Sequence, residues 1–417
     1  MAGFFMLLGD ILDENNKVIS TASEILYDLC RYGIYSTNLH VNKDSDRWSK
    51  QKISVFTDYL SMREGDYIFF FTNRKIYGVG KLVKVGDSCV HWAFKGANEP
   101  IAYSEKNITR TKLFNTILPD NRCVCFFKPL QYFKHAIDMD EALTSYPDSF
   151  KSLRVIEGRS FIKMDDEEAT ALFSVMSKRN STDSESNEAD WIPPVFDDSK
   201  HKLALKRIKA NKSYYEFNTA SFLSDFSVID NDMISEEMAI EAALVECLNK
   251  NTNKILGEVS YVSHQVTASP AKPVGYMELM DVFGYTTSKF LIENAVPIQF
   301  SINQFFVAEI KRGTLYLEYS RKKEPKYVRD NKAAANQLMK YVDWIANNYA
   351  SGKYPMVKGI LVANDFDAKF IDYCRKLCVR NYNDGYRNPT PSIWNKIILL
   401  KYSFDGAHIK FKNVPLE

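Results

Sequence analysis

The stretch INQFFVAEIKRG, residues 302–313, decides the fold and the chemistry of the C-terminal half of this chain. Its apolar run FFVA predicts a buried strand, and Glu309 and Lys311 follow that run two residues apart. Because side chains alternate across a strand, Glu309 and Lys311 project from the same face. Burying a carboxylate and an ammonium is costly unless they have partners or a chemical role. A lone Glu-x-Lys pair is more often a surface ion pair. The neighbouring sequence therefore has to show whether Glu309 and Lys311 have a chemical role.

A second carboxylate lies upstream, in GYMELMDVFGY at residues 275–285. Asp281 sits inside this apolar strand, and two carboxylates from adjacent strands can bind Mg²⁺ or Mn²⁺ through oxygen ligands. Such an ion would lower the pKa of a bound water, while Lys311 orients that water or neutralises charge on a phosphate. Glu278 is a rival for this role, but strand alternation puts it on the opposite face. Asp281 is therefore preferred.

The surrounding sequence has the alternating helix and strand order of an α/β domain. A helix is expected at 235–250, and strands at 259–266, 277–283 and 305–310. A helix at 331–349, a strand at 357–363, a helix at 367–379 and a strand at 396–402 complete the order. Glu241 in IEAALVECL and Gln337 in AANQLMKYVDWI lie on two of these helices. Each could reach the Asp281 and Glu309 pair from one flank, or could simply face solvent.

This order of helical Glu, strand Asp, strand Glu-x-Lys and helical QLxxY resembles the PD-(D/E)xK nuclease superfamily. The segments VAEIKRG, NQLMKYVDWI and VKGILVA are similar to RecB-like domains, such as those of NucS-type endonucleases and Shedu-type bacterial defence nucleases. The resemblance implies a restriction-endonuclease-like fold, a mixed sheet flanked by helices, over about residues 235–405. It implies Asp281 and Glu309 as metal ligands, Lys311 as catalytic lysine, Glu241 as helical acid and Gln337 as flanking polar residue. The separation of Asp281 from Glu309 exceeds the usual hairpin, which implies an insertion.

The N-terminal part reads as a mainly β domain over residues 1–177. The start, MAGFFMLLGD, predicts a buried first strand, and strands at 67–71 and 76–85 are joined by a turn at 72–75. A closing helix is expected at 164–176, where acidic residues precede apolar ones. The segments DRWSKQKISVFTDYL and MREGDYIFFFTNRKIYGVGKLV resemble the PUA-like superfamily, which includes the EVE and YTH domains. That resemblance implies a small β-barrel that reads a nucleobase between aromatic rings.

Four aromatic residues are candidates for such a pocket: Trp48, Trp92, Tyr67 and Tyr77. Trp48 is preferred because it follows Asp46 and Arg47 in a polar loop, an unusual place for a core tryptophan. Tyr67 and Tyr77 lie on strands and are more often core residues.

A polar stretch at 178–200, with a Pro-Pro pair, predicts a linker before the basic segment KHKLALKRIKANK. That segment opens a connector at 201–234 that precedes the nuclease-like domain at 235–417. Lys206, Arg207 and Lys209 are candidate phosphate contacts, although a basic run is more often a solvated helix face.

The bulk composition fits two folded units in 417 residues, with 45% hydrophobic and 25% charged side chains. The net charge of +2 neither favours nor excludes a polyanionic partner. Seven scattered cysteines, without the paired spacing of a zinc site, indicate a reducing cytoplasm. No apolar run approaches the roughly 18 to 20 residues that would cross a membrane.

The sequence therefore predicts a Mg²⁺- or Mn²⁺-dependent DNA endonuclease of bacterial antiphage defence, with an N-terminal domain that senses the DNA target. Because one such site cuts one strand, a homodimer or homotetramer is expected. Helix 331–349 and the region of Trp394 are candidate contact surfaces, although Trp344 and Trp394 could equally be core residues. The alternatives are a DNA-repair nuclease of the NucS type and a nucleic-acid-binding protein that has lost catalysis.

Overall fold

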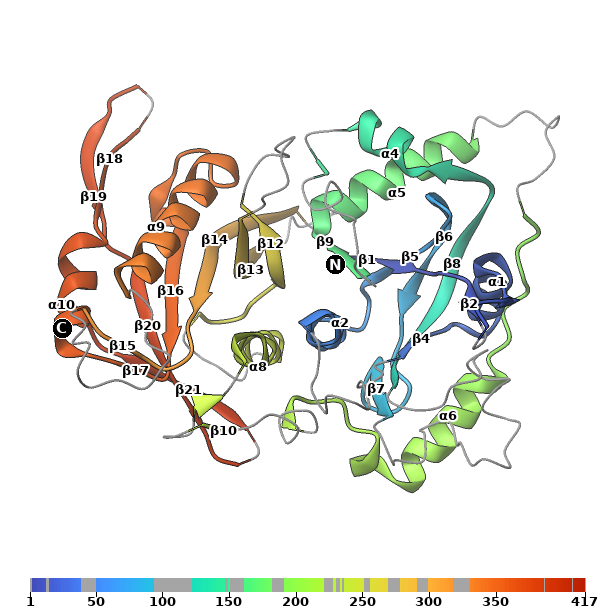
Figure 1. The fold of residues 1–417 in the computed structure, drawn as a ribbon. Helices are drawn as coiled ribbons and strands as arrows, with labels where there is room; N and C mark the ends of the chain where they lie inside the picture. Colours follow the sequence, from blue (N-terminus) through green and yellow to red (C-terminus); the bar gives the residue numbers. More distant parts are fainter. Residues whose placement is uncertain are drawn as a thin grey trace. The chain divides into compact units, whose positions relative to one another are not determined.

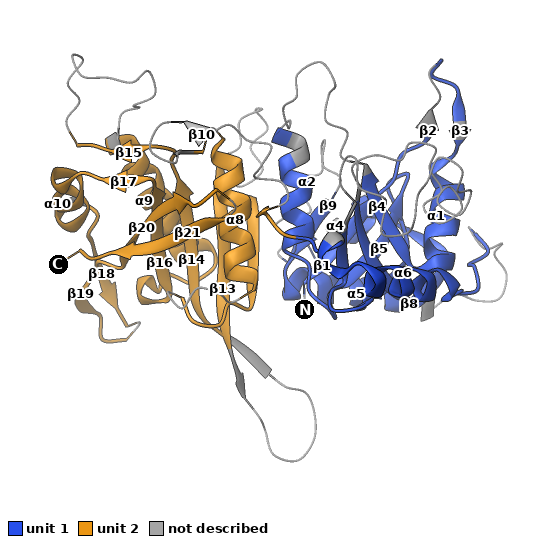
Figure 2. Cartoon of the chain, turned by 90° about the horizontal axis from the view of Figure 1, so that it is seen from below, with its two compact units in different colours: residues 1–217 blue, residues 218–417 orange. Residues whose placement is uncertain are grey.

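The computed structural model divides the chain into two compact units, Met1–Phe217 and Asn218–Glu417 (Figure 2). It describes residues 2–12, 15–38, 50–93, 122–146, 149–150, 161–181, 191–220, 228–229, 233–234, 236–250, 256–268, 278–290, 299–317, 331–385, 387–406 and 408–416. Within these ranges, no helix has the length and apolar character that a membrane crossing requires. This division falls after residue 217, between the expected domain ends at 177 and 235.

The first unit contains a seven-stranded sheet in the order β4-β8-β6-β5-β1-β9, with β7 also paired to β8 (Figure 1). Strands β1 and β5 are parallel, and the other pairs are antiparallel. The strands are β1 (Gly3–Leu7), β4 (Ile34–Asn38), β5 (Tyr67–Thr72), β6 (Lys75–Leu82), β7 (Val90–Ala93), β8 (Arg122–Asp138) and β9 (Phe161–Met164), beside a separate pair of β2 (Ile11–Leu12) and β3 (Val18–Ser20). The predicted first strand is confirmed, and so is the predicted hairpin, whose second strand is β6 at Lys75–Leu82 in place of 76–85.

Helices accompany this sheet, so the expectation of a mainly β domain is wrong. They are α1 (Ala22–Tyr32), α2 (Lys50–Leu60), α4 (Met139–Ser145), α5 (Asp166–Ser181) and α6 (Ser199–Ala210), followed by the short η1 (Lys212–Tyr214). Helix α1 begins at a capping box in which Thr21 accepts from the Glu24 amide and Glu24 reaches back to Thr21. It ends at Gly33, whose φ of 62° favours glycine. Helix α5 is the predicted closing helix.

Part of the expected linker at 178–200 and the first part of the expected connector at 201–234 pack on the first unit, which ends at Phe217. Ala204 and Ile208 of α6 are buried with Val124 and Phe126 of β8. Upstream, the Trp191 Nε1 donates a hydrogen bond of 2.8 Å to the Phe133 carbonyl. The apolar face of α6 thus anchors the basic helix, and residues 191–210 belong to this unit. Residues 182–190 of the predicted linker lie outside the described residues.

The second unit is built on a six-stranded mixed sheet in the order β12-β13-β14-β16-β20-β21. Strands β14, β16 and β20 are parallel to each other, and the remaining pairs are antiparallel. The strands are β12 (Tyr261–Thr267), β13 (Leu279–Phe290), β14 (Gln299–Ile310), β16 (Val357–Ala363), β20 (Ile397–Phe404) and β21 (Ile409–Val414). The predicted strand at 357–363 is β16 with the same bounds, and β21 was not predicted.

The helices of this unit are α8 (Glu237–Asn249), α9 (Asn331–Asn348) and α10 (Ala368–Leu377), with the short η2 (Tyr354–Met356) after α9. Shorter strand pairs are β10 (Val228–Ile229) with β11 (Met233–Ile234), β15 (Thr314–Leu315) with β17 (Asp365–Phe366), and β18 (Arg380–Asp384) with β19 (Thr390–Trp394). Helix α9 packs over β16, where a Cβ at Gly359 would lie 3.1 Å from Val342. This contact identifies the α9 face of the sheet.

The long separation of Asp281 from Glu309 has a simple origin. Strands β13 and β14 have twelve residues each and pair from Val282↔Ala308 to Phe290↔Gln299. The implied insertion is therefore largely an extension of the two strands, with a register irregularity at Thr286 and Thr287. Residues 291–298, which connect them, lie outside the described residues.

Candidate active site

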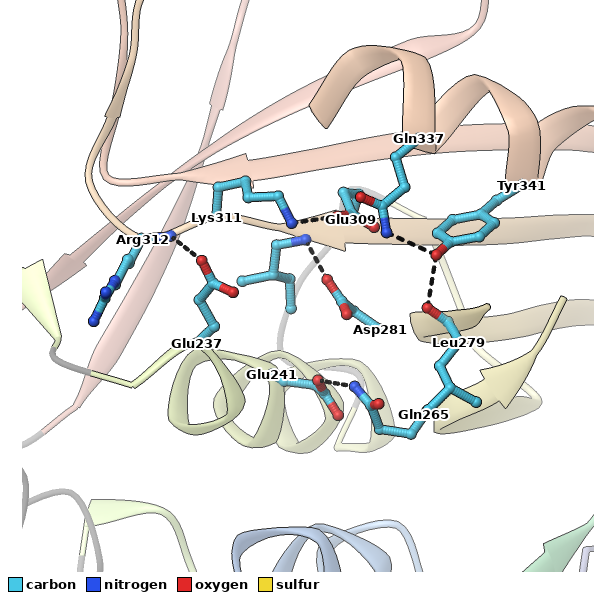
Figure 3. Close-up of polar contacts among 11 residues, drawn as sticks. Glu237, Glu241, Gln265, Leu279, Asp281, Glu309, Lys311, Arg312, Gln337 and Tyr341 are labelled. Atoms are coloured by element: carbon cyan, nitrogen blue, oxygen red, sulfur yellow. Dashed lines mark hydrogen bonds and ion pairs between the residues drawn. The ribbon is translucent and has the colours of Figure 1, made fainter. Parts of the chain in front are cut away.

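The two strand carboxylates lie opposite each other where β13 begins and β14 ends (Figure 3). Val282 pairs with Ala308, so one further step of this antiparallel register places Asp281 opposite Glu309. Asp281 is fixed there because its Oδ2 accepts a 2.7 Å hydrogen bond from the Ile310 amide. Glu309 also pairs with Leu361, two residues beyond Gly359, which puts both carboxylates on the α9 face.

Glu309 is fully buried, with 0% of its surface exposed. One of its oxygens, Oε1, accepts a hydrogen bond from the Lys311 ammonium. The other, Oε2, is buried and has no hydrogen-bond partner among the described residues. A buried carboxylate oxygen without a hydrogen bond raises the free energy of the folded protein. The position of this atom therefore indicates that a cation or a water molecule binds beside it.

The ionisation of the three central side chains reflects this crowding. Burial raises the pKa of Asp281 well above its usual range, and the negative charges of Glu309 and Glu241 raise it further. Burial also raises the pKa of Glu309 to about 7, against the opposing effect of the Lys311 charge. Burial acts to lower the pKa of Lys311, but attraction to Glu309 outweighs it, and the pKa lies above its usual value. Lys311 therefore stays charged beside carboxyls that resist ionisation.

Helix α8 places Glu241 on the other side of this pair, where its carboxylate is already engaged. Its Oε1 lies 2.7 Å from the His264 Nδ1, and its Oε2 accepts a 2.8 Å hydrogen bond from Gln265. Both partners belong to β12, and Glu241 is only 2% exposed. The predicted helical acid thus acts on Asp281 through its charge, while its oxygens bind β12.

A second α8 carboxylate, which was not among the predicted site residues, faces the end of β14. The Glu237 Oε1 accepts a 3.4 Å hydrogen bond from the Arg312 amide. Its charge contributes to raising the pKa of both Glu309 and Lys311. Glu237 precedes Glu241 by one helical turn, so the four-residue spacing was the available signal.

Helix α9 contributes a hydrogen-bonded pair that holds the beginning of β13. The Gln337 side chain donates to the Tyr341 hydroxyl at 2.8 Å, and that hydroxyl donates to the Leu279 carbonyl at 2.8 Å. Leu279 lies two residues before Asp281 (Figure 3). Gln337 and Tyr341 therefore position the strand that carries Asp281.

The rival carboxylate Glu278 lies elsewhere. It precedes β13, is partly exposed, and lies 3.9 Å from the Lys340 ammonium. Trp394, one of the candidate contact residues, is buried in the core, where its Nε1 donates to the Val357 carbonyl at 2.9 Å. The surface alternative for Trp394 is therefore wrong.

Some of the candidate nucleic-acid contacts of the first unit lie among the described residues, and others do not. Lys206 and Lys209 are exposed on α6, and Arg207 is half-buried. Tyr67 stacks on Phe173, and Tyr77 meets Trp191 edge to face, which accounts for both tyrosines as packing residues. Trp48 and the side chain of Trp92 lie outside the described residues.

Two carboxylates, those of Asp281 and Glu309, are the candidate metal ligands at this site. In the described parts of the chain, no three His, Cys, Asp or Glu side chains form a group that could hold a metal ion. Asp281 and Glu309 still present the oxygen donors that Mg²⁺ prefers, and Mg²⁺ commonly uses one or two carboxylates together with waters. The unpartnered Glu309 Oε2 and the raised pKa values of both carboxyls fit a site that gains from a cation.

Known proteins resemble this chain only at low sequence identity. No family model matches the chain, and no curated protein matches it. Human THYN1 protein, in a crystal structure with 5-methylcytosine containing DNA, is similar at 12% identity and a TM-score of 0.26, covering 42% of this chain and 98% of that one. The DUF55 domain of human thymocyte nuclear protein 1 gives 12% identity, 42% and 98% coverage and a TM-score of 0.25. A protein from Pseudomonas putida gives 13% identity, 42% and 99% coverage and a TM-score of 0.22. At these scores the likenesses assign no family.

Proposed function

We propose that the chain is a metal-dependent DNA endonuclease whose second unit cuts and whose first unit senses the DNA target. The observation that carries the proposal is the convergence of Asp281, Glu309 and Lys311 at the start of β13 and the end of β14. They share one face of the sheet, and a buried Glu309 oxygen there has no partner among the described residues. Two acids and a lysine in this arrangement form the minimum set for phosphodiester hydrolysis.

Asp281 and Glu309 would hold Mg²⁺ or Mn²⁺, because their oxygens are mutually repelling and one lacks a partner among the described residues. When bound, such an ion supplies Lewis-acid stabilisation of the charge that builds on a scissile phosphate. The Ile310 amide holds Asp281 in place, and the Gln337–Tyr341 pair holds the strand that carries it.

Lys311 brings positive charge to the same point. Its side chain is 20% exposed, so the ammonium can reach a bound phosphate while it remains hydrogen-bonded to Glu309. A preorganised charge of this kind stabilises a transition state without reorganising solvent. Lys311 also orients the attacking water in this proposal.

The role in bacterial antiphage defence rests on the resemblance of VAEIKRG and its following helix to Shedu-type nucleases. Target sensing by the first unit rests on the resemblance of residues 46–83 to the PUA-like superfamily. The exposed lysines of α6 offer that unit a phosphate contact.

The proposal is tested by incubating purified protein with plasmid, linear, single-stranded and base-modified DNA, with and without Mg²⁺ or Mn²⁺. Cleavage that requires the metal supports the assignment, and a preference for one DNA form identifies the sensed feature. Absence of cleavage from every substrate with either metal would reject the nuclease.

A further inference from the structure

A row of lysines crosses the second sheet from the candidate active site to its edge. Ile310 pairs with Val362, and the Lys311 amide donates to the Val362 carbonyl, so Lys311 lies beside Ala363. Ala363 pairs with Lys401, and Lys401 pairs with Lys412. Paired residues of neighbouring strands point to the same face. Lys311, Lys401 and Lys412 therefore share the α9 face with Glu309.

The row continues on β21, the last strand of the sheet among the described residues. Lys410 lies two residues before Lys412 in β21 and thus points to the same face. Lys410 and Lys412 are exposed, and Lys401 is partly exposed. The alternate residues Tyr402 and Phe411 pair across these strands on the opposite face, where Tyr402 is fully buried. The strand pattern thus leaves the lysines on the accessible side.

Two aspartates form ion pairs with lysines of this row. Lys401 lies 3.0 Å from Asp365, and Lys410 lies 2.7 Å from Asp405, both as solvent-exposed pairs. Lys412 has no ion-pair partner among the described residues. Exposed ion pairs of this kind contribute about 0 to 1 kcal/mol, so a phosphate can displace the carboxylates.

We propose that Lys401, Lys410 and Lys412 bind the backbone phosphates of DNA that enters the active site at Lys311. This inference rests on the proposed function and extends it by naming a substrate-binding surface. Three strand spacings of about 4.8 Å separate Lys311 from Lys412, about 14 Å in all. Phosphates of one strand of B-form DNA rise by about 3.4 Å each, so the row spans about four nucleotides along the helix axis.

The test measures binding of a short fluorescent DNA duplex in the presence of a chelator, across a range of salt concentrations. The variant carries Lys401→Gln, Lys410→Gln and Lys412→Gln. Its affinity should fall about tenfold or more, and its salt slope should drop by about 0.9 for each phosphate that the variant no longer neutralises. The control carries Lys250→Gln, Lys353→Gln and Lys396→Gln, three other exposed lysines of the same unit. The control should bind as wild type does, and thermal melting should show that both variants fold.

A second variant, which should raise the affinity for DNA, makes the test more specific. Asp365→Asn frees Lys401 while its side-chain oxygen can still accept the hydrogen bond from the Phe366 amide. This variant should bind DNA more tightly than wild type. An unchanged salt slope in the triple lysine variant, an equal loss in the control, or no tightening by Asp365→Asn would overturn the proposal.

The failures of the two proposals are distinguishable. Metal-dependent cleavage by wild type with an unchanged salt slope in the lysine variant would keep the nuclease and reject the phosphate surface. A reduced slope without cleavage of any DNA would keep the phosphate surface and reject the nuclease. Absence of DNA binding by wild type would reject both.

Discussion

Replacement of Asp281 by Asn should stabilise the metal-free protein at pH 8 and abolish the proposed DNA cleavage. Asp281 and Glu309 are held together on one face, and each has a raised pKa. Asn has the same shape and can still accept the Ile310 amide hydrogen bond. The substitution therefore removes one of two like charges with little loss of packing, as expected where a site is arranged for function rather than stability.

Glu309 shows the sign and the scale of the change in stability with pH. The folded protein holds a proton on this carboxyl more tightly than the unfolded chain, so stability is lost as the pH rises from the ordinary pKa of 4.5 through about 7. That interval corresponds to about 3 kcal/mol at full ionisation, at 1.36 kcal/mol per pKa unit. Asp281 adds to this penalty, because burial and the negative charges of Glu309 and Glu241 oppose its own ionisation. Its replacement should therefore recover about 1 to 2 kcal/mol, or about 3 to 6 °C in the melting temperature of a unit this size.

Scanning calorimetry of wild type and Asp281→Asn, with chelator, at pH 8 and pH 5.5 provides the assay. The gain should be present at pH 8 and much smaller at pH 5.5, which lies below the Glu309 pKa of about 7, so that this carboxyl is largely protonated. Added Mg²⁺ should raise the melting temperature of wild type and leave that of the variant nearly unchanged. A variant that is less stable at pH 8, or that gains equally at both pH values, would refute the argument from charge repulsion.

Three further outcomes are expected. Tyr341→Phe should cost about 1 to 2 kcal/mol of stability and slow cleavage, because the Leu279 carbonyl and Gln337 lose their shared partner; unchanged melting and rate would contradict the positioning role. Replacing Lys206, Arg207 and Lys209 by Gln should flatten the salt dependence of DNA binding, whereas an unaltered slope would leave α6 as a solvated helix. Light scattering should give a dimer or tetramer, and a monomer without DNA would mean that the protein nicks or assembles on its target.

The sequence predicted the second unit well because its elements are strongly periodic. The apolar runs around Val357 and Phe305 are long enough to specify buried strands, and the Glu-x-Lys spacing alone places two charged side chains on one face. The pairing of Asp281 with Glu309 could not be derived from periodicity, because it depends on the register of a hairpin with twelve residues on each strand.

Other features depended on contacts between distant segments. His264 lies between two other polar residues of β12, Ser263 and Gln265, and only the packing of α8 on β12 makes it a partner of Glu241. Helix α6 reads as a basic connector, yet Ala204 and Ile208 anchor it to the first sheet. Helix α1 was not predicted, although Thr21 and Glu24 have the spacing of a capping box and could have indicated where it begins.

The most direct test of the central claim is metal-dependent cleavage of plasmid DNA by wild type, Lys311→Ala and Lys340→Ala. Lys311 contacts the buried Glu309, whereas Lys340 is an exposed lysine of α9 near Glu278. Wild type and Lys340→Ala should cleave with Mg²⁺ or Mn²⁺, and Lys311→Ala should bind DNA without cutting it. Equal cleavage by Lys311→Ala and wild type would contradict the assignment of this site as a nuclease centre.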